Sequence, residues 1–560
     1  MDRQPPRTTS NEIDLYIRTY YSLLKSSGDV RVRGFEEAHL YSRSSLHAGA
    51  LAPEPDVAAF AYSAARLPAC MPHVQRLVLG QSLEQFSRAG FPVASWKTVG
   101  TRGRRRPLRW DGAGTLAVFV ASASDIDDLV PIVTAYQIEW NKLHGRLHDT
   151  LPASTELDDE ALATRLGLGA DDVRTLRAGL SGDVRGGLAA IAEHPLDLTV
   201  RLLDGAFREY QRSAAHWWRA IERARPLVTQ RPVYFVSSNS HSLANLLGGY
   251  AFAHTDELAA FTRAENPEGL AATLDATLGG SDDGARANLL YYLLRAFLKD
   301  PATAAERVAA VQAHDASCGI HTIASPARID VTAQVIELSK LRLSDMDPRA
   351  RVPGIERLAE SDAVIVNIDY PLGMAAYHHL VAIAEGVGEI RGVYIMGKAA
   401  TLNGRVGDVM ISKVVHDEHS GNTYLTRNAI TAADVQPFMR HGTVLDNQKA
   451  LTVRSAFLQN RSYMDVFYRE GYTVMEMEAG PYLSAIYETA APQRHPKGEI
   501  VNLTDLLHGE LGLIHYASDT PYSRRQSLLS KSMSYFGMES TYGCALAIAR
   551  RIFLRELGPR

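Results

Sequence analysis

Short apolar runs separated by polar segments characterise the second half of the chain. These runs have the length and composition of buried β-strands, and they lie at residues 319–325, 362–368, 392–397, 408–415, 472–477 and 511–518. Helical or irregular segments separate them, which is the pattern of an α/β protein whose sheet is largely buried. We therefore expect one α/β domain at residues 315–560, with a connecting helix in front of it at residues 294–314.

The first half has longer stretches of helical periodicity and fewer strand-like runs. A continuous apolar run at residues 115–121 predicts a buried strand, and the pattern that follows it predicts a long helix at 125–144. Another buried strand is predicted at 232–238, again directly before a helix start. We therefore expect a mainly helical region at residues 1–110 and a helix-rich α/β region of unknown role at residues 111–314.

Length and composition indicate a multidomain globular protein. At 560 residues the chain is too long for one ordinary core, and 46% hydrophobic and 22% charged residues are typical of soluble proteins. The net charge of -4 gives no general attraction to nucleic acid, and no run of about 18 apolar residues predicts a membrane span. Distant cysteines, the lack of a secretory signal and the absence of CxxC and HExxH patterns favour a cytoplasmic protein without metal or cofactor.

The most informative polar residues lie at the end of the strand predicted at 472–477. Glu476 and Glu478 flank Met477, and in a strand the two carboxylates would share one face while the methionine takes the other. Carboxylates this close repel each other unless a diol, a cation or a proton bridges them. The alternative is a strand-to-helix junction whose acids face water and favour a helix N-terminus. Further along the chain, Asp519 follows another apolar strand.

Four motifs occur in an order that is found in one enzyme superfamily. They are IASPARIDVTAQVIEL (323–338), IDYPLGMAAYHHLVAIAE (368–385), GVYIMGKAATLNGRVGDVMIS (392–412) and SYMDVFYREGYTVMEMEAGPY (462–482). In this order they resemble the nucleoside phosphorylase and nucleosidase superfamily, specifically its purine nucleoside phosphorylase and uridine phosphorylase branch. The resemblance covers residues 315–550 and implies a phosphorylase-type mixed sheet flanked by helices. It also implies that the first motif forms a strand, the phosphate loop and a following helix.

The resemblance assigns roles to residues near two of the apolar strands. Glu478 would bind the ribose hydroxyls, with Met477 packed under the sugar and Glu476 nearby. The aromatic ring of Phe457 would stack on the base. Asp519 would donate a proton to N7 of a purine as the glycosidic bond breaks, and uridine-specific relatives lack this aspartate. Burial by the apolar run before Asp519 would raise its pKa, as a general acid at neutral pH requires.

The phosphate site of the superfamily is altered in this sequence. Arg328 matches the arginine of the phosphate loop, but SPAR stands where a Gly-Asp-Pro type of sequence is usual. Ile395 stands in place of a usual arginine, and Lys398 in place of a usual serine offers a point charge rather than a guanidinium fork. Inorganic phosphate, bound by Arg328 and Lys398, is therefore one expected nucleophile, and water is the alternative.

An arginine-rich segment lies in the first half of the chain. Residues 101–109, TRGRRRPLR, contain five arginines that could meet phosphate groups. A solvated loop is the favoured interpretation, because runs of like charge usually stay in water.

The sequence thus predicts an enzyme that cleaves the N-glycosidic bond of a purine nucleoside or nucleotide, by phosphorolysis or hydrolysis. The N-terminal half would regulate this reaction or select the substrate. The alternative is a catalytically degenerate protein that binds a nucleotide as a sensor or assembly factor. The altered phosphate site favours this alternative, whereas Glu478 and Asp519 favour the enzyme. Each site in the resembling superfamily borrows residues from a neighbouring subunit, so a homo-oligomer is also expected.

Overall fold

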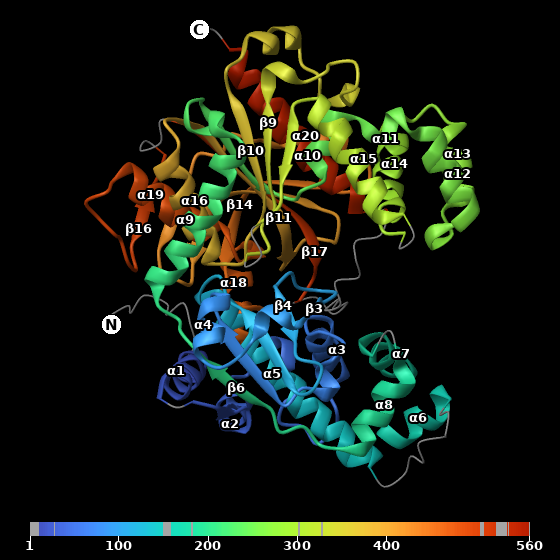
Figure 1. Ribbon diagram of the computed structural model, residues 1–560, viewed down its shortest axis with the longest axis vertical. Helices are drawn as coiled ribbons and strands as arrows, with labels where there is room; N and C mark the ends of the chain where they lie inside the picture. The colour runs from blue at the N-terminus through green and yellow to red at the C-terminus, as the bar shows by residue number, and fades with distance from the viewer. Residues whose placement is uncertain are drawn as a thin grey trace.

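The computed structural model contains two units that follow one another along the sequence, each built on its own β-sheet (Figure 1). The structure describes residues 11–26, 28–148, 158–180, 183–300, 303–325, 329–504, 509–521, 535 and 537–558. We call residues 11–202 the N-terminal unit and residues 207–558 the C-terminal unit. The N-terminal unit lies at the bottom of Figure 1 and the C-terminal unit at the top.

The N-terminal unit is an α/β fold around short strands. These are β1 (Val30–Arg31), β2 (Arg76–Gly80), β3 (Lys97–Val99), β4 (Leu108–Trp110), β5 (Thr115–Phe119) and β6 (Thr199–Leu202), in the sheet order β1-β6-β2-β5-β4-β3. β2 pairs in parallel with β5 and β6, and β2 and β5 are largely buried, as their apolar sequences require. β1 to β4 lie within residues 1–110, so the prediction of a mainly helical region there missed these short strands.

The longest helix of the N-terminal unit is its central element. The α-helices of this unit are α1 (Asn11–Ser26), α2 (Arg33–Tyr41), α3 (Val57–Ala65), α4 (Leu83–Arg88), α5 (Ala123–Leu147), α6 (Asp159–Leu166), α7 (Ala170–Gly179) and α8 (Val184–Glu193). α5 confirms the long helix predicted after the strand at 115–121. Every residue of α5 from Ser124 to Trp140 is buried, including several acids, so these acids need partners inside the protein.

A chain of buried polar groups connects α5 to the helices beside it. The hydroxyl oxygen of Tyr16 lies 3.1 Å from Nδ1 of His39, and Nε2 of His39 lies 2.8 Å from Nδ1 of His47. Nε2 of His47 lies 2.6 Å from a carboxylate oxygen of Glu139, and the ammonium of Lys142 lies 2.7 Å from the same oxygen. The side chains of His47 and Glu139 are fully buried, so this chain satisfies polar groups that cannot reach water.

The C-terminal unit contains an eleven-stranded mixed sheet. Its strands are β7 (Val233–Ser238), β8 (Ile320–Ile323), β9 (Ala333–Glu337), β10 (Val364–Asp369), β11 (Ile390–Thr401), β12 (Val409–Asp417), β13 (Thr423–Leu425), β14 (Val444–Thr452), β15 (Tyr472–Glu476), β16 (Ile500–Asn502) and β17 (Glu510–Asp519). The order is β16-β13-β12-β14-β15-β11-β7-β10-β9-β8, and β17 pairs with both β11 and β12.

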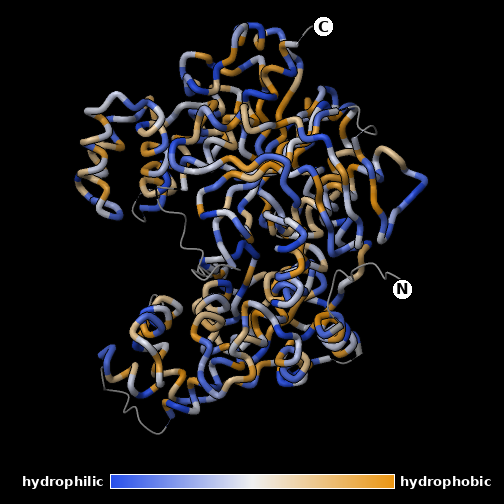
Figure 2. Tube along the Cα trace, turned by 180° about the vertical axis from the view of Figure 1, so that it is seen from behind, coloured by the Kyte–Doolittle hydropathy of each residue, from blue (hydrophilic) through white to orange (hydrophobic). Residues whose placement is uncertain are grey.

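Side chains that alternate along the strands divide the core of the C-terminal unit into two layers. Tyr234 and Val236 of β7 face one layer, and Val233 and Phe235 face the other. The first layer is covered by α10 (Ser242–Gly248), α11 (Tyr250–Ala253), α12 (Thr255–Glu265), α13 (Ala271–Leu278), α14 (Asp283–Phe297), α15 (Ala304–Ser317), α17 (Ala432–Val435) and α20 (Gly537–Glu556). The second is covered by α9 (Phe207–Ala224), α16 (Ala375–Gly386) and α19 (Ala479–Ala490). Figure 2 shows hydrophobic stretches along the inner strands between these layers.

Five strands of the large sheet close into a ring. β11 pairs with β15 and β17, β17 pairs with β12, β12 pairs with β14, and β14 pairs with β15. β11 belongs to both the open sheet and the ring because it is 12 residues long and its register with β17 shifts between Ala399 and Ala400. A further helix, α18 (Arg461–Arg469), packs beside β15.

The structure confirms the strands predicted from the sequence and corrects some of their surroundings. Each strand-like run of the second half overlaps a strand. The helix expected after the phosphate loop is instead β9, which pairs antiparallel with both β8 and β10. β7 lies between β10 and β11, so the C-terminal sheet begins well before the boundary expected at residue 315. The expected connecting helix at 294–314 is the end of α14 and most of α15.

Among the residues that the structure describes, none of the helices combines the length and the apolar character of a membrane span.

Replacing Glu139 by alanine should destabilise the N-terminal unit. The change leaves His47 and Lys142 without their shared partner, and breaking a buried charged pair typically costs about 3–5 kcal/mol. Urea unfolding followed by circular dichroism measures this loss. Arg174→Ala is the control, because Arg174 is 72% exposed in its ion pair with Asp171 and should change stability by less than about 0.5 kcal/mol. Equal unfolding midpoints for the two variants would contradict the buried polar chain.

Candidate active site

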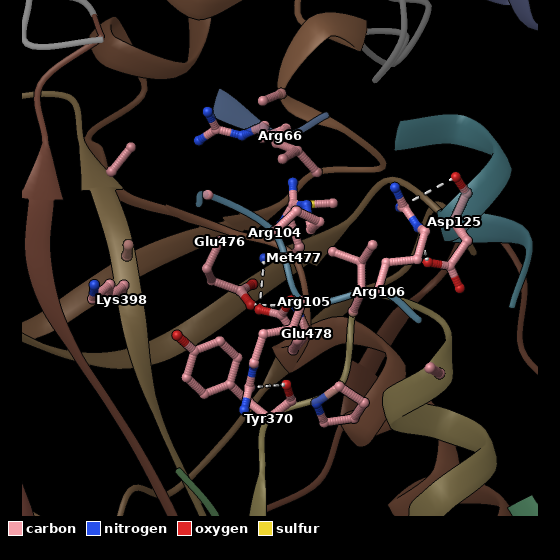
Figure 3. Close-up of a pocket in the computed structure, with 18 of the residues that line it drawn as sticks. Arg66, Arg104, Arg105, Arg106, Asp125, Tyr370, Lys398, Glu476, Met477 and Glu478 are labelled. Carbon is pink, nitrogen blue, oxygen red and sulfur yellow. Dashed lines mark hydrogen bonds and ion pairs between the residues drawn. The ribbon is translucent and has the colours of Figure 1, made fainter. Parts of the chain in front are cut away.

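A cavity lies between the two units. Its volume is about 540 Å³, within the range of ~300–1,000 Å³ that is usual for small-molecule sites. The N-terminal unit contributes Tyr62, Arg66 and residues 101–107, and the C-terminal unit contributes the ends of β11, β15 and β17. Figure 3 shows arginines of the N-terminal unit and carboxylates of the C-terminal unit around the same space.

The register of three strands sets the geometry of this cavity. Ala400 of β11 pairs with Asp519 of β17 on one side and with Met475 of β15 on the other. Neighbouring strands lie ~4.8 Å apart, so the ends of β15 and β17 are separated by about two strand spacings. Glu476, Met477 and Glu478 follow Met475 directly. The predicted acid and the predicted carboxylate pair therefore lie on the two sides of one strand end.

Glu476 is the last residue of β15 and is 3% exposed. One carboxylate oxygen accepts hydrogen bonds from the backbone N–H groups of Glu478 (2.6 Å) and Ala479 (2.7 Å), and the other accepts one from the hydroxyl of Thr452. These N–H groups lie at the start of α19, so Glu476 holds the N-terminus of that helix. Burial, together with the neighbouring charge of Glu478, raises the pKa of Glu476 to about 8.

Glu478 precedes the first residue of α19 and lines the cavity together with Met477. One of its carboxylate oxygens accepts a hydrogen bond of 3.4 Å from the backbone N–H of Gly373. Burial raises the pKa of Glu478 to about 7, although this hydrogen bond and the charge of Arg104 oppose the shift. The segment is thus a strand-to-helix junction, as the alternative interpretation held. Its acids, however, do not face open water, because Glu476 is buried and Glu478 is half-buried at the cavity.

Asp519 is the last residue of β17 and also lines the cavity. Its Oδ2 accepts a hydrogen bond of 3.0 Å from the hydroxyl of Ser518. Its Oδ1 is buried and has no hydrogen-bond partner among the described residues. Burial raises the pKa of Asp519, and the charges of Arg66 and Lys398 oppose this shift. Among the described residues, Oδ1 of Asp519 is therefore a buried polar atom that lacks a hydrogen-bond donor.

Of the other residues singled out from the sequence, some line the cavity and some do not. Lys398 of β11 lines the cavity. Phe457 is fully buried in the core of the N-terminal unit, where its ring centroid lies 5.3 Å from that of Tyr62. This position does not support the predicted stacking of Phe457 on a base. Arg328 lies outside the described residues. Ile395 is 2% exposed and packs in the core layer under α9, α16 and α19, away from the cavity.

The arginine-rich segment is part of the cavity wall, so the prediction of a solvated loop is wrong. Arg104 donates two hydrogen bonds to the carboxylate of Asp128, at 3.0 and 2.6 Å. Arg106 donates one hydrogen bond to Asp128 and one to Asp125, both at 3.0 Å. The side chain of Arg106 is 2% exposed. The acidic residues at the start of α5 were the feature of the sequence that could have indicated ion pairs with these arginines. Their spacing alone, however, does not show that α5 and the arginine-rich segment lie in contact.

Arg105 of the same segment connects the two units. A guanidinium nitrogen lies 2.6 Å from a carboxylate oxygen of Asp369, at the end of β10, and another donates to the backbone oxygen of Tyr370 at 3.2 Å. Figure 3 shows Arg105 beside Tyr370 and below Arg104. The N-terminal unit is therefore attached at the rim of the cavity by a charged contact.

The mixed α/β fold and the cavity between its two units define this as an α/β protein with a cavity of the size usual for small-molecule sites. The chain belongs to the family of unknown function DUF6909, whose family model matches residues 32–554. A search of the curated proteins finds no match.

Several solved structures of the nucleoside phosphorylase and nucleosidase fold are similar to less than half of this chain. A methylthioadenosine phosphorylase sourced from an antarctic soil metagenomic library is 8% identical, with 43% of this chain and 81% of that chain covered and a TM-score of 0.27. A 5'-methylthioadenosine/S-adenosylhomocysteine nucleosidase from S. pneumoniae is 12% identical, with 45% and 95% covered and a TM-score of 0.27. Isoform 2 of uridine phosphorylase from Schistosoma mansoni is 12% identical, with 34% and 70% covered and a TM-score of 0.23.

Replacing Glu476 by glutamine should change how stability depends on pH. A carboxyl group whose pKa rises to about 8 on folding stabilises the folded state below its unfolded pKa, and this contribution is lost as the pH rises through about 8. The wild-type protein should therefore lose stability relative to Glu476→Gln between about pH 5 and about pH 9. Unfolding free energies in urea at several pH values measure the difference. Glu499→Gln, at a partly exposed ion pair with Arg494, is the control. A difference that stays constant with pH would contradict a protonated Glu476.

Proposed function

We propose that the cavity binds a purine nucleoside or nucleotide and cleaves its N-glycosidic bond. The observation that carries this proposal is the strand register around Ala400, which brings Asp519 and Glu478 to the two sides of one strand end. The motif resemblance independently assigns Asp519 to the base and Glu478 to the ribose. The cavity volume of about 540 Å³ suits a ligand of this size.

The chemistry of glycosidic cleavage matches the groups on each side. Breaking the bond builds positive charge on the ribose and negative charge on the departing purine. A proton from Asp519 would neutralise the purine, and general acids typically contribute ~10²–10⁴-fold. Asp519 suits this role because burial raises its pKa and its Oδ1 has no partner among the described residues. Glu478, once ionised, would accept hydrogen bonds from the 2′- and 3′-hydroxyls and orient the sugar.

The nucleophile in this proposal is water or inorganic phosphate. Lys398 lines the cavity and would attract phosphate as a point charge. Ile395 supplies no charge, because it is apolar and buried in the core. From a nucleoside, hydrolysis gives free ribose and phosphorolysis gives ribose 1-phosphate, and a nucleotide gives the same sugars with the 5′-phosphate retained, so the products identify the nucleophile.

The direct test is to incubate the purified protein with adenosine, inosine, guanosine and AMP, with and without phosphate, and to assay free base by chromatography. Base release supports the proposal, and its dependence on phosphate separates phosphorolysis from hydrolysis. The second candidate is a sensor that binds a nucleotide without cleaving it, which the altered phosphate site favours. The sensor replaces the enzyme as the proposed function if no base is released while a nucleotide raises the melting temperature of the protein.

The homo-oligomer expected from the resemblance stays a prediction. Residues of this chain's own N-terminal unit, such as Tyr62 and Arg104, already line the cavity. We propose that the N-terminal unit takes the place over the site that a neighbouring subunit has in the resembling superfamily, so that a single chain provides both walls.

Replacing Asp519 by asparagine should lower turnover by ~10²-fold or more and largely spare substrate affinity, because the variant keeps the shape but loses the acidic proton. Steady-state rates of base release and the Michaelis constant separate these effects. Asp362→Asn is the control, because the Asp362 side chain is 69% exposed and does not line this cavity. Near-normal turnover of Asp519→Asn would remove Asp519 from the mechanism.

Replacing Glu478 by glutamine should weaken the binding of ribosides by ~1.5–3 kcal/mol, the usual value for hydrogen bonds to a charged group. The loss should grow as the pH rises through about 7, because Glu478 becomes a carboxylate above its pKa. Titration calorimetry with a riboside and its 2′-deoxy analogue measures both effects. The 2′-deoxy compound should suffer less. Equal losses for the two compounds would show that Glu478 only maintains the fold.

A further inference from the structure

Arg66 is a buried arginine in the wall of the cavity. It follows the last residue of α3 and is 9% exposed. One guanidinium nitrogen donates a hydrogen bond of 3.0 Å to the backbone oxygen of Tyr62, and the guanidinium lies 3.4 Å from the centre of the Tyr62 ring. These two contacts fix the side chain at the C-terminal end of α3, where the helix dipole favours a cation. Figure 3 shows Arg66 across the cavity from Glu476 and Glu478.

Arg66 differs in its partners from three other arginines of the wall. Arg104, Arg105 and Arg106 each bind a carboxylate. Within the described part of the chain, Arg66 forms no ion pair, and its Nε is buried without an acceptor. A buried guanidinium whose N–H group lacks an acceptor is costly unless a bound group supplies one. The position therefore favours a ligand that offers an anionic acceptor directly to this guanidinium.

The surroundings of Arg66 suit an anion that is part of, or lies beside, the bound ligand. Lys398 lines the same cavity and also forms no ion pair with a described carboxylate. The charge of Asp519 acts on both cations, while Asp128 adds negative charge and Arg104 adds positive charge near Arg66. A planar guanidinium offers two parallel N–H donors, which match the oxygens of a phosphate group better than an ammonium does.

We propose that the N-terminal unit supplies an anion site inside the cavity, in which Arg66 binds a phosphate group. This inference rests on the proposed function, because it names the class of ligand for the same cavity. The phosphate group has two chemical sources, the 5′-phosphate of a purine nucleotide or free inorganic phosphate beside a nucleoside. In both cases the N-terminal unit takes part directly in ligand choice.

Equilibrium binding tests the site without relying on turnover. Titration calorimetry measures the affinity of adenosine, AMP and inorganic phosphate, and of phosphate in the presence of adenosine, for the wild-type protein and for Arg66→Met. Arg66→Met should bind a phosphate-bearing probe about 10- to 100-fold more weakly, as expected for one lost charge-assisted pair, and should bind adenosine as the wild type does. Arg66→Lys keeps the charge without the fork and should lose less.

The control is Arg109→Met, because Arg109 donates to the backbone oxygens of Val93 and Ala94 and does not line the cavity. Circular dichroism checks that each variant is folded, and Arg66→Lys replaces Arg66→Met if the latter is not. A loss confined to AMP identifies the 5′-phosphate as the occupant, and a loss confined to inorganic phosphate identifies free phosphate. Both results support the site.

Other outcomes separate this inference from the proposed function. If Arg66→Met and Arg66→Lys bind AMP and phosphate as tightly as the wild type while base release continues, the anion site is wrong and the function stands. If AMP binds through Arg66 but no base is released, the site stands and the function fails. If the wild-type protein binds none of the probes, both are overturned.

Discussion

The double pairing of β11 is the constraint on which the candidate site depends. One residue of this strand, Ala400, pairs with Met475 of β15 on one side and with Asp519 of β17 on the other. The closed ring of five strands fixes both neighbours, since a slip of one residue in either strand would turn its side chains to the opposite face. An acid from one segment and a carboxylate pair from another, more than forty residues apart in the sequence, are thereby held about two strand spacings from each other.

Buried charged groups explain why the N-terminal unit lies against the end of β11. The first turns of α5 bury Asp125 and Asp128, which need cationic partners, and Arg104 and Arg106 provide them. The same turn of α5 touches the C-terminal unit, where the hydroxyl of Ser124 accepts a hydrogen bond of 2.9 Å from the backbone N–H of Met374. Gly373, beside Met374, lies so close to Ser124 that a Cβ atom would not fit there, and its N–H donates to Glu478. α5, which binds the arginine-rich segment, is thus linked through Gly373 to the carboxylate of Glu478 in the cavity.

The sequence was sufficient for the parts of the fold that depend on local pattern. Apolar runs gave the strands β5, β7, β10, β11, β12, β15 and β17, and the period of 3.6 residues gave α5. The sequence was not sufficient where a β-strand pairs with strands that are distant in the sequence. β7 has the same pattern whether it belongs to one unit or the other, and only its pairing with β10 and β11 decides. Asp519 and Glu478 were found because motifs mark them, whereas Arg66 has no motif. Its importance follows from burial without a carboxylate partner among the described residues, which only the folded chain shows.

Glu476 and Glu478, at the end of β15, share a protonation equilibrium that ligand binding would shift. Burial raises the pKa of Glu476 to about 8 and that of Glu478 to about 7, so at neutral pH the pair holds at least part of one proton. Glu476 is held by Thr452 and by the N-terminus of α19, so it is poorly placed to move. Among the described residues, Glu478 accepts long hydrogen bonds of 3.3 and 3.4 Å from backbone N–H groups and is the less constrained of the two. A ribose diol would donate two hydrogen bonds to Glu478 and favour its ionised form, leaving the proton on Glu476. The repulsion between adjacent carboxylates would then be avoided without a metal ion, with one acid kept neutral inside the protein and the other ionised against the sugar.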